Sequence, residues 1–435
     1  MNIWVSFTPE FSPERGHSPA KEVDLPTYRN RVYTDVNRSA ILAHLGAYGP
    51  VSRAELARKL EVTPPLITQL VRQLISDGLV QELHLSPSSG GRPSRMLGLV
   101  STAGHAIGVK IAVEQITLVE VSIDGVVVRS LDAPFNSASP MAVTAVAELI
   151  RSFIEGGDAH LLGIGVGVPG EIDEQNVGIV NSTQLGWNRV PLGSTLRHAL
   201  NLPVFIDNNV NALSMAERLF GQGRFFKDFL VVTIGTGVGA GIVADGKVFR
   251  GHRGGAGDLG HIPVGENGPI CQCGNRSCLE AYIGEKALIK IAQEQGVIGE
   301  GEGISALTRK ADEGDYAAKL IFSQAGNMLG RTLAGVVNVL DPEIVIIMGE
   351  GIDAWRHWSN GFGPTFRSAL APSKRDVAIG VETWRDDSWA RGAACLVLAI
   401  PFDLAEIAGD QGELVRVRLR AGANSLTTFE PKLSS

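Results

Sequence analysis

The stretch LVVTIGTGVGAGIVADGKVFRG, Leu230–Gly251, joins two apolar runs through a glycine-rich loop. The apolar runs predict two strands, and Asp245-Gly246 predicts a tight hairpin turn before a short further strand. Small residues around Thr236 can bring backbone N–H groups to an anion, although a glycine-rich loop can also be a plain tight turn. Taken alone, the loop leaves both interpretations open.

An earlier stretch repeats the same pattern. IGVKIAVEQITLVEVSIDGVVVRS, Ile107–Ser130, is again strand–loop–strand, and its Asp124-Gly125 is the counterpart of Asp245-Gly246. From His105 onward, strands alternate with helical stretches. Two such halves facing one cleft predict the α/β, two-lobed architecture of actin-like proteins and sugar kinases, in which each half supplies a hairpin loop for nucleotide phosphate.

The two predicted loops differ in chemistry. The first has Val113, Glu114 and Gln115 where an anion loop needs small residues, and Glu114 would repel a phosphate. Gly349 and Gly351, which follow an apolar strand, could line an adenine pocket or cap a buried strand. Because the first loop lacks the residues of an anion loop, we favour the interpretation that these glycines cap a buried strand.

Length and composition set the class of protein. The 435 residues are 44% hydrophobic and 20% charged, as in a soluble globular chain of two or three domains. We see neither a bilayer-spanning apolar run nor a secretory signal, and expect a cytoplasmic protein with no membrane partner. Residues 25–100 carry nine Lys/Arg against five Asp/Glu, a net +4, whereas the whole chain is −7. A basic block on an acidic body suggests that this end meets a polyanion.

The basic block has the pattern of a winged helix-turn-helix. After a tail expected over residues 1–30, one helix ends at Gly49-Pro50, and a second opens with Ser52 and Glu55 at capping-box spacing. Thr63 and Pro64-Pro65 open a third helix, and two strands follow. A small helical bundle is the alternative, but the spacing of three helices plus a wing favours DNA binding over residues 31–100.

The third helix offers side chains that reach base edges and phosphates in a major groove. The wing and linker, residues 86–96, carry arginine on extended Gly-Gly-Arg-Pro backbone, which fits a narrow minor groove but also an ordinary interdomain linker. The candidate DNA-binding residues are Arg53, Thr63, Pro64, Pro65, Thr68, Gln69, Arg72, Arg92 and Arg95.

A metal site is the most specific local signal. In GDLGHIPVGENGPICQCGNRSCLEAY, His261 precedes Cys271, Cys273 and Cys278, three of the chain's four cysteines. One imidazole and three thiolates form a closed tetrahedral set, so we predict structural rather than catalytic Zn²⁺. A redox pair or free thiols are the alternatives, and neither explains the histidine. Asp258 and Glu280 flank this loop and suit a polyhydroxy ligand; ordinary surface acids are the alternative.

A polar cluster follows a further predicted strand in PVFIDNNVNA, Pro203–Ala212. Asp and Asn are common turn residues, so the stretch could be no more than a turn. The alternatives are a catalytic centre and a ligand site, and the residues alone do not choose among them.

Together these motifs resemble the ROK family of repressors, open reading frames and sugar kinases over roughly residues 33–400. Ile234–His261 looks like its signature segment, and His261 with CQCGNRSC looks like its zinc motif. The resemblance implies a sugar-binding domain over residues 101–402, with 403–435 as an extension of unassigned role. The sugar-binding residues that it implies are Asn181, Thr183, Asn208, Asn209, Asp258, His261 and Glu280.

Three departures from the family kinases concern chemistry. The stretch Lys110–Glu114 has none of the residues of their Asp-x-Gly-Gly-Thr phosphate loop, and Asp258 replaces the Glu of their Glu-x-Gly-His. Asn209 stands where they have the Asp that takes the sugar hydroxyl's proton, and an amide cannot act as that base. We therefore expect no catalytic residue and no ATP cofactor.

The first hypothesis is a sugar-responsive transcription regulator, a repressor of carbohydrate genes that a sugar or sugar phosphate releases from DNA. We expect a homodimer or homotetramer on a palindromic operator. The alternative is an ATP-dependent sugar kinase with a DNA-binding appendage. The sequence names neither the sugar, the operator nor the direction of regulation.

Overall fold

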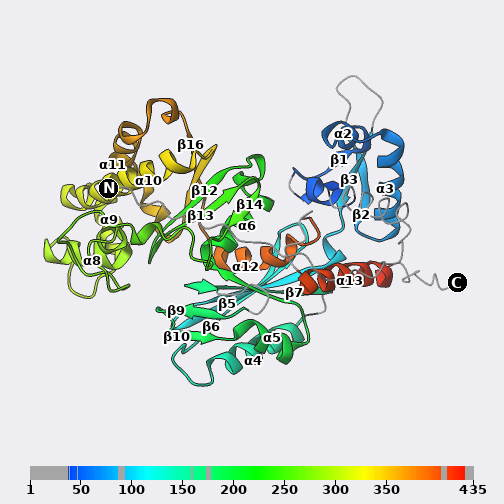
Figure 1. Cartoon of the computed structure of the whole chain (residues 1–435), viewed down its shortest axis with the longest axis horizontal. Helices are drawn as coiled ribbons and strands as arrows, with labels where there is room; N and C mark the ends of the chain where they lie inside the picture. The colour runs from blue at the N-terminus through cyan, green and yellow to red at the C-terminus, as the bar shows by residue number, and fades with distance from the viewer. Residues whose placement is uncertain are drawn as a thin grey trace, which may run out of the picture.

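The computed structural model describes residues 38–86, 94–157, 160–172, 178–402 and 409–426, apart from positions 39 and 47. The tail expected over residues 1–30 and the wing residue Arg92 lie outside these residues. Figure 1 shows an N-terminal unit beside a larger body built of two lobes.

The N-terminal unit is a winged helix. Residues 40–46 are helical, and α2 (Arg53–Lys59) and α3 (Pro64–Ser76) follow. An antiparallel sheet of order β1-β3-β2 forms the wing base from β1 (Val51–Ser52), β2 (Val80–Ser86) and β3 (Ser94–Leu99). The hydroxyl of Ser52 accepts the N–H of Glu55 at 3.3 Å, as the capping spacing predicts. The carboxylate of Glu55 pairs with Arg58 instead of completing the capping box.

The N-terminal lobe has a five-stranded sheet of order β11-β7-β4-β5-β6. The parallel strand β7 is buried along its whole length, which explains its continuous run of apolar residues and glycine. Helices α4 and α5 cover one face of the sheet (Figure 1). The bounds are η1 (Ser101–Ala103), β4 (His105–Ile111), β5 (Gln115–Ser122), β6 (Val127–Pro134), α4 (Ala142–Glu155), β7 (Leu161–Val168), α5 (Leu192–Leu200) and β11 (Val204–Asn208), with a small sheet of β8 (Glu171–Ile172), β9 (Val180–Ser182) and β10 (Trp187–Val190).

The C-terminal lobe repeats the plan with a sheet of order β14-β13-β12-β15-β16. Its hairpin turn has Asp245 at φ 49° and Gly246 at φ 70°, the left-handed pair that an Asp-Gly turn supplies. The bounds are β12 (Phe229–Ile234), β13 (Val238–Ala244), β14 (Lys247–Phe249), η3 (Leu259–His261), α7 (Glu280–Ile283), α8 (Glu285–Glu294), α9 (Ile304–Asp312), α10 (Tyr316–Leu340), β15 (Ile344–Met348), η4 (Glu350–Ala354), α11 (Trp355–Ala369), η5 (Pro372–Lys374) and β16 (Ala378–Val381).

Two helices pack between the sheets of the two lobes. They are α6 (Asn209–Phe220) and α12 (Ser388–Leu398), which contact each other, and α12 lies directly on β4 and β7. That approach requires glycine: a Cβ at Gly108 would lie 1.9 Å from the Ala390 carbonyl oxygen, and one at Gly165 would lie 1.8 Å from that of Ala393. Cys395 of α12 is fully buried and packs there as a small hydrophobic residue.

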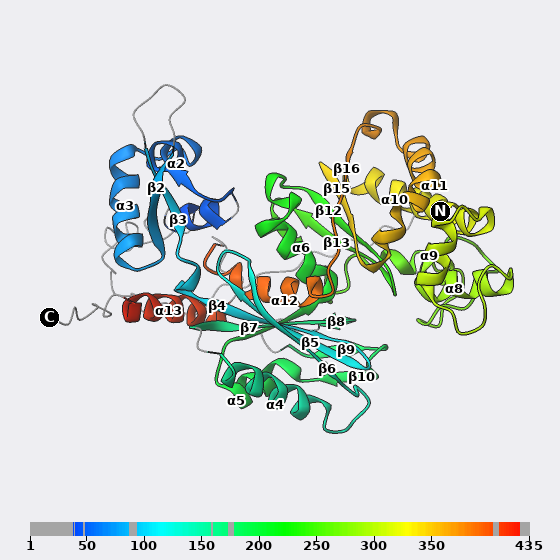
Figure 2. The same cartoon turned by 180° about the vertical axis from the view of Figure 1, so that it is seen from behind.

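The C-terminal helix α13 (Gly409–Leu426) lies beneath the winged helix in Figure 1, and Figure 2 shows the same arrangement from behind. Its Val415 and Leu419 belong to one continuous hydrophobic cluster with Ile41 and Leu45 of the first helix. The ring of Phe402 packs close to Gly46. The N-terminal winged helix therefore rests on the body through a shared core.

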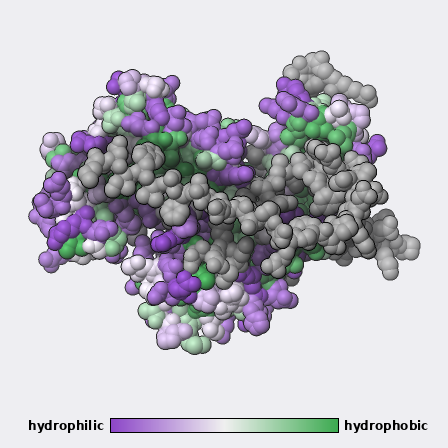
Figure 3. Space-filling model, viewed as in Figure 1, coloured by the Kyte–Doolittle hydropathy of each residue, from purple (hydrophilic) through white to green (hydrophobic). Residues whose placement is uncertain are grey.

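In the described residues, no helix is long and apolar enough to cross a membrane. The face in Figure 3 is mostly hydrophilic over the two lobes, with small separate hydrophobic areas. This surface matches the moderate charge content of the sequence.

Candidate functional site

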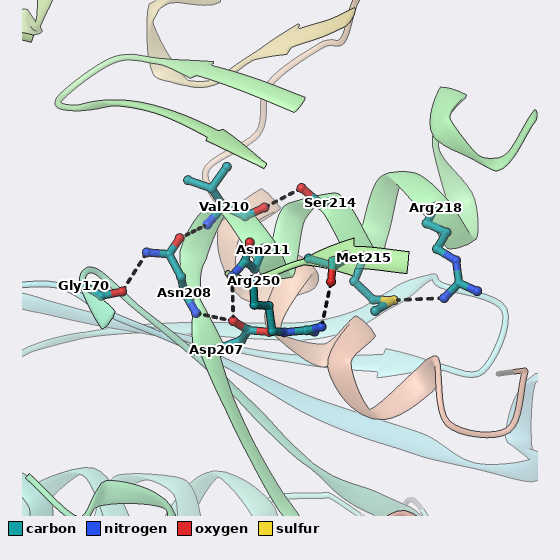
Figure 4. Close-up of polar contacts among 10 residues, drawn as sticks. Gly170, Asp207, Asn208, Val210, Asn211, Ser214, Met215, Arg218 and Arg250 are labelled. Carbon is teal, nitrogen blue, oxygen red and sulfur yellow. Dashed lines mark hydrogen bonds and ion pairs between the residues drawn. The ribbon is translucent and has the colours of Figure 1, made fainter. Parts of the chain in front are cut away.

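The polar cluster predicted after a strand lies at the end of β11 and the start of α6 (Figure 4). Asn208 is the N-cap of α6: its side-chain oxygen accepts the N–H of Val210 at 2.8 Å, while its amide nitrogen donates to the Gly170 carbonyl at 2.9 Å. The cap therefore fixes both the helix and the neighbouring loop.

Asp207 is 4% exposed and fully engaged. One carboxylate oxygen accepts the Asn208 N–H at 2.8 Å and the Asn211 side-chain N–H at 2.9 Å. The other accepts Arg250 Nε at 2.7 Å. Since Arg250 follows β14 of the other lobe, this half-buried ion pair joins the lobes directly at the cluster.

Asn209 differs from its neighbours in one respect. Its side-chain oxygen is buried and has no hydrogen-bond partner. That oxygen lies beside Gly167 of β7, where a Cβ would approach it to 2.7 Å. A buried unpaired acceptor is costly, so this oxygen is a candidate to accept a hydrogen bond from a bound molecule. A sugar hydroxyl supplies such a donor.

The four predicted metal ligands come together. Nδ1 of His261 and the sulfurs of Cys271, Cys273 and Cys278 all lie within 4.8 Å of one another, and they could hold a metal ion. The Cys271 Sγ to His261 Nδ1 distance and the Cys273 to Cys278 sulfur distance are both 3.7 Å. Ligands about 2.0–2.3 Å from a tetrahedral Zn²⁺ are separated by about 3.5–3.8 Å, so these positions fit the ion.

The metal loop is built by tight local turns. Gly274, at φ 90°, donates its N–H to the Cys271 carbonyl at 2.9 Å, which reverses the chain between the first two thiols. Gly260 lies so close to β13 that a Cβ there would meet the Val238 carbonyl oxygen at 2.3 Å. The loop is thus pressed against the glycine-rich hairpin. With Nδ1 of His261 turned to the sulfurs, Nε2 is left for another contact.

The acids that flank the metal loop take different positions. Glu280 begins α7, and its Oε2 accepts the Val238 N–H at 2.9 Å. Asp258 is the N-cap of η3, and desolvation raises the pKa of its carboxyl while nearby His261 lowers it. Each acid therefore lies between the metal loop and the hairpin.

The remaining predicted sugar residues come from the small sheet. Asn181 in β9 accepts the Arg189 N–H at 2.9 Å, and Thr183 is exposed just beyond that strand. The side-chain oxygen of Asn181 is thus already engaged with the protein.

A second polar cluster, which the sequence analysis missed, lies between the lobes. Trp389 of α12 donates its indole N–H to Glu350 Oε1 at 2.6 Å, and Lys110 of β4 lies 4.0 Å from the same oxygen. Lys110 also lies over the Trp389 ring, 5.5 Å from its centroid. Burial lowers the pKa of Lys110, and the Glu350 carboxylate opposes that shift. No periodicity or motif in the sequence joins these three residues.

Some of the candidate DNA-binding side chains are exposed without a partner among the described residues, and others already bond to neighbouring residues of the winged helix. The side chains of Gln69 and Arg72 are exposed on α3 and form no hydrogen bond or ion pair with another described residue, whereas the Thr68 hydroxyl donates to the Pro64 carbonyl. Thr63, Pro64 and Pro65 are exposed at the start of the helix. Arg53 and Arg95 both pair with Glu82 of β2.

The winged helix contacts the body where α6 ends. The Tyr48 hydroxyl donates to the Arg224 carbonyl at 3.1 Å, and the Tyr48 ring lies 5.5 Å from that of Phe225. Both partners belong to η2 (Gln222–Phe225), and Arg224 in turn donates to the Phe220 carbonyl at the end of α6 at 2.9 Å. Helix α6, followed by η2, therefore connects the Asn208–Asn209 cluster to the N-terminal winged helix.

The chain joins a winged helix to a two-lobed, kinase-like body that carries a His/Cys₃ site. This combination defines the class of protein, and comparison with known proteins identifies the family. The ROK family profile matches residues 106–400, and a winged helix-turn-helix DNA-binding profile matches residues 34–81. The chain belongs to the ROK family.

Curated relatives include a xylose repressor and a DNA-binding dual regulator of transcription. The chain is 31% identical to the xylose repressor of Bacillus spizizenii over 323 residues, covering 73% of this chain and 83% of that protein. It is 28% identical to the DNA-binding transcriptional dual regulator NagC of Escherichia coli over 330 residues, covering 73% and 81%.

Solved structures show the same fold. A ROK family transcriptional regulator, a homologue of the E. coli MLC protein, matches with a TM-score of 0.71 at 24% identity, covering 90% of this chain and 100% of that one. A ROK family glucokinase from Streptomyces griseus matches with a TM-score of 0.60 at 26% identity, covering 67% of this chain and 99% of that one. The family thus includes both regulators and enzymes.

Proposed function

We propose that the chain is a sugar-responsive, DNA-binding transcriptional regulator, a repressor of carbohydrate genes that its effector releases from DNA. One observation carries the proposal: α6 starts at the Asn208–Asn209 cluster and ends, through η2, on Tyr48 of the winged helix. The kinship with repressors of xylose and of N-acetylglucosamine genes supports it. We assign residues 31–100 to DNA binding, 101–402 to the sugar-binding domain and 403–435 to an extension.

In this proposal the sugar lies between α6, the small sheet and the metal loop. Asn209 offers its unpaired oxygen to a sugar hydroxyl, and His261 offers Nε2. Asp258 and the free oxygen of Glu280 accept further hydroxyls, with Asn208, Asn181 and Thr183 at the edge of the site. Zn²⁺ held by His261 and the three cysteines has a structural role, because it fixes the loop and the orientation of that imidazole.

Sugar binding would then act on DNA through α6. Because Asp207 and Arg250 already join the lobes at the site, a ligand that tightens this contact shifts α6 and η2 together. Tyr48 would pass that shift to the winged helix, and by linkage the sugar and the operator weaken each other's binding. We expect a homodimer or homotetramer on a palindromic operator, in the cytoplasm.

Sugar phosphorylation is the alternative, since ROK structures include kinases. Asn209 argues against it, because an amide cannot accept the proton of the attacking hydroxyl. Lys110–Glu114 also lacks the phosphate loop of the kinases. We therefore propose a regulator without catalytic residues or bound ATP.

A thermal-shift screen of the full chain against sugars, sugar phosphates and ATP, with a coupled assay for phosphoryl transfer, tests this proposal. We expect at least one sugar to raise the melting temperature, and Asn209→Ala to weaken that ligand about ten-fold or more. Phosphoryl transfer by the wild type that is lost in Asn209→Ala would establish the kinase instead.

A further inference from the structure

The glycine-rich hairpin that would hold a phosphate is occupied by the protein's own carboxylates. The Val238 N–H, the natural donor for an anion there, already donates to Glu280 Oε2 at 2.9 Å. Glu350 covers the other end of the loop, because a Cβ at Gly235 would lie only 2.4 Å from its Oε2. The Glu280 carboxylate thus takes a backbone N–H that the loop could offer to a phosphate oxygen, and the Glu350 carboxylate lies beside the same loop.

A third acid adds to the negative charge at this loop. The Glu285 N–H donates to the Gly235 carbonyl at 2.9 Å, which places the start of α8 against the hairpin. Desolvation raises the pKa of the Glu285 carboxyl, and the charge of Glu350 raises it further. A phosphate here would add negative charge to a place where carboxylates already repel one another.

The nearby cation, Lys110, already has protein partners. Lys110 lies 4.0 Å from Glu350 Oε1 and over the ring of Trp389, whose N–H donates to the same carboxylate oxygen. To bind Lys110, a phosphate must displace Glu350 and leave that carboxylate unpaired. Because Glu350 already pairs with Lys110, it disfavours a phosphate that would have to take its place.

The sugar site faces this cluster. Lys110 of β4 is in register with Gly167 of β7, so both point to the same face of the sheet. Gly167 is the residue against which the unpaired oxygen of Asn209 lies. A hydroxyl held by Asn209 therefore lies on the same side as the Lys110–Glu350 pair, and a phosphate ester on that hydroxyl would approach carboxylates.

We propose that the effector is a neutral, unphosphorylated sugar, and that Glu350 is a specificity-determining residue that excludes phosphate esters from the cleft. This inference rests on the proposed function. It narrows the class of ligand from sugars and sugar phosphates to free sugars. It also assigns the cluster of Lys110, Glu350 and Trp389 a role in discriminating between a free sugar and its phosphate ester.

Calorimetric titration of the full-length protein with matched pairs tests the inference. The probes are glucose, mannose and N-acetylglucosamine, each beside its 6-phosphate, and xylose beside xylose 1-phosphate, because the terminal oxygen of xylopyranose lies in the ring. For the sugar that binds, we expect the free form to bind at least ten-fold more tightly than its ester. In Glu350→Gln that ratio should fall at least three-fold, through tighter binding of the ester.

The control variant is Glu294→Gln, which removes an exposed carboxylate of α8 and should keep the wild-type ratio. An ester that binds more tightly than its parent sugar would overturn the inference while leaving a sugar-responsive regulator intact. A ratio unchanged in folded Glu350→Gln would also overturn it. If neither member of any pair binds, both the proposed function and this inference fail.

Discussion

Glu217 shows at the residue scale how the core of the body depends on pH. It lies on α6, is 7% exposed and accepts the Gln222 N–H at 2.9 Å. Desolvation, with the charge of Glu382, raises its pKa from 4.5 to about 7. The folded protein thus holds this proton over a pH range in which the unfolded chain has lost it.

The first prediction follows from the sign of that shift. Between pH 4.5 and about 7 the folded state binds more protons than the unfolded state, so the free energy of unfolding falls as the pH rises through this window. Glu217→Gln, which needs no proton, should be more stable than the wild type by about 1–3 kcal/mol at pH 8 and should lose this advantage below pH 4.5. Urea unfolding at both pH values measures the difference.

A matched control for that prediction is Glu148→Gln on the exposed face of α4. It should keep the wild-type dependence of stability on pH. If Glu217→Gln were no more stable than the wild type at pH 8, the proposed cost of the buried carboxylate would be wrong.

At the element scale, the loop of His261 and three cysteines acts as one unit. Because the Cys271 and Cys278 side chains are buried and their sulfurs lie within 4.8 Å of each other, a metal ion that neutralises their thiolates stabilises the loop. We expect about one Zn²⁺ per chain by native mass spectrometry, loss of the ion in Cys278→Ser, and a lower melting temperature after chelation. Cys395→Ala, which changes a cysteine outside the loop, should keep the metal. Full stability after complete removal of metal would contradict a structural role.

Helix α6 with η2 is the second element whose role can be tested. Tyr48→Ala removes both the hydrogen bond to Arg224 and the ring contact with Phe225. We expect sugar affinity to persist while the factor by which sugar weakens DNA binding falls about three-fold or more. Tyr316→Ala, at a tyrosine that is 79% exposed on α10, is the control. A Tyr48→Ala protein with wild-type coupling would rule out this contact as the route.

Local sequence patterns predicted the elements but not the contacts between them. Ser52 and Asp245-Gly246 act within a few residues of chain, and so do the turns that gather Cys271, Cys273 and Cys278; spacing alone therefore indicates them. The Asp207–Arg250 and Lys110–Glu350 contacts join different lobes.

No pattern in the sequence marks such pairs, because an arginine or glutamate after a strand looks the same whether it faces solvent or a partner. The unpaired oxygen of Asn209 likewise depends on how closely β7 approaches α6. Asn209 itself was visible in the sequence, but its surroundings were not.

At the scale of the whole molecule, α6 and η2 connect the proposed sugar site to the N-terminal winged helix. The winged helix shares a hydrophobic cluster with Phe402, Val415 and Leu419, so it packs on a surface that the body and α13 build together. In the proposed mechanism, a change at the sugar site would alter the position of α3, where Gln69 and Arg72 are exposed.

The most direct test of the central claim is the affinity of the full-length protein for its operator, with and without the sugar that stabilises it. The operator can be selected from random DNA by the protein itself, and fluorescence anisotropy at fixed salt gives both dissociation constants. We predict that saturating sugar weakens operator binding by about 5- to 150-fold. An operator affinity that stays the same at saturation with the sugar would contradict a sugar-responsive regulator.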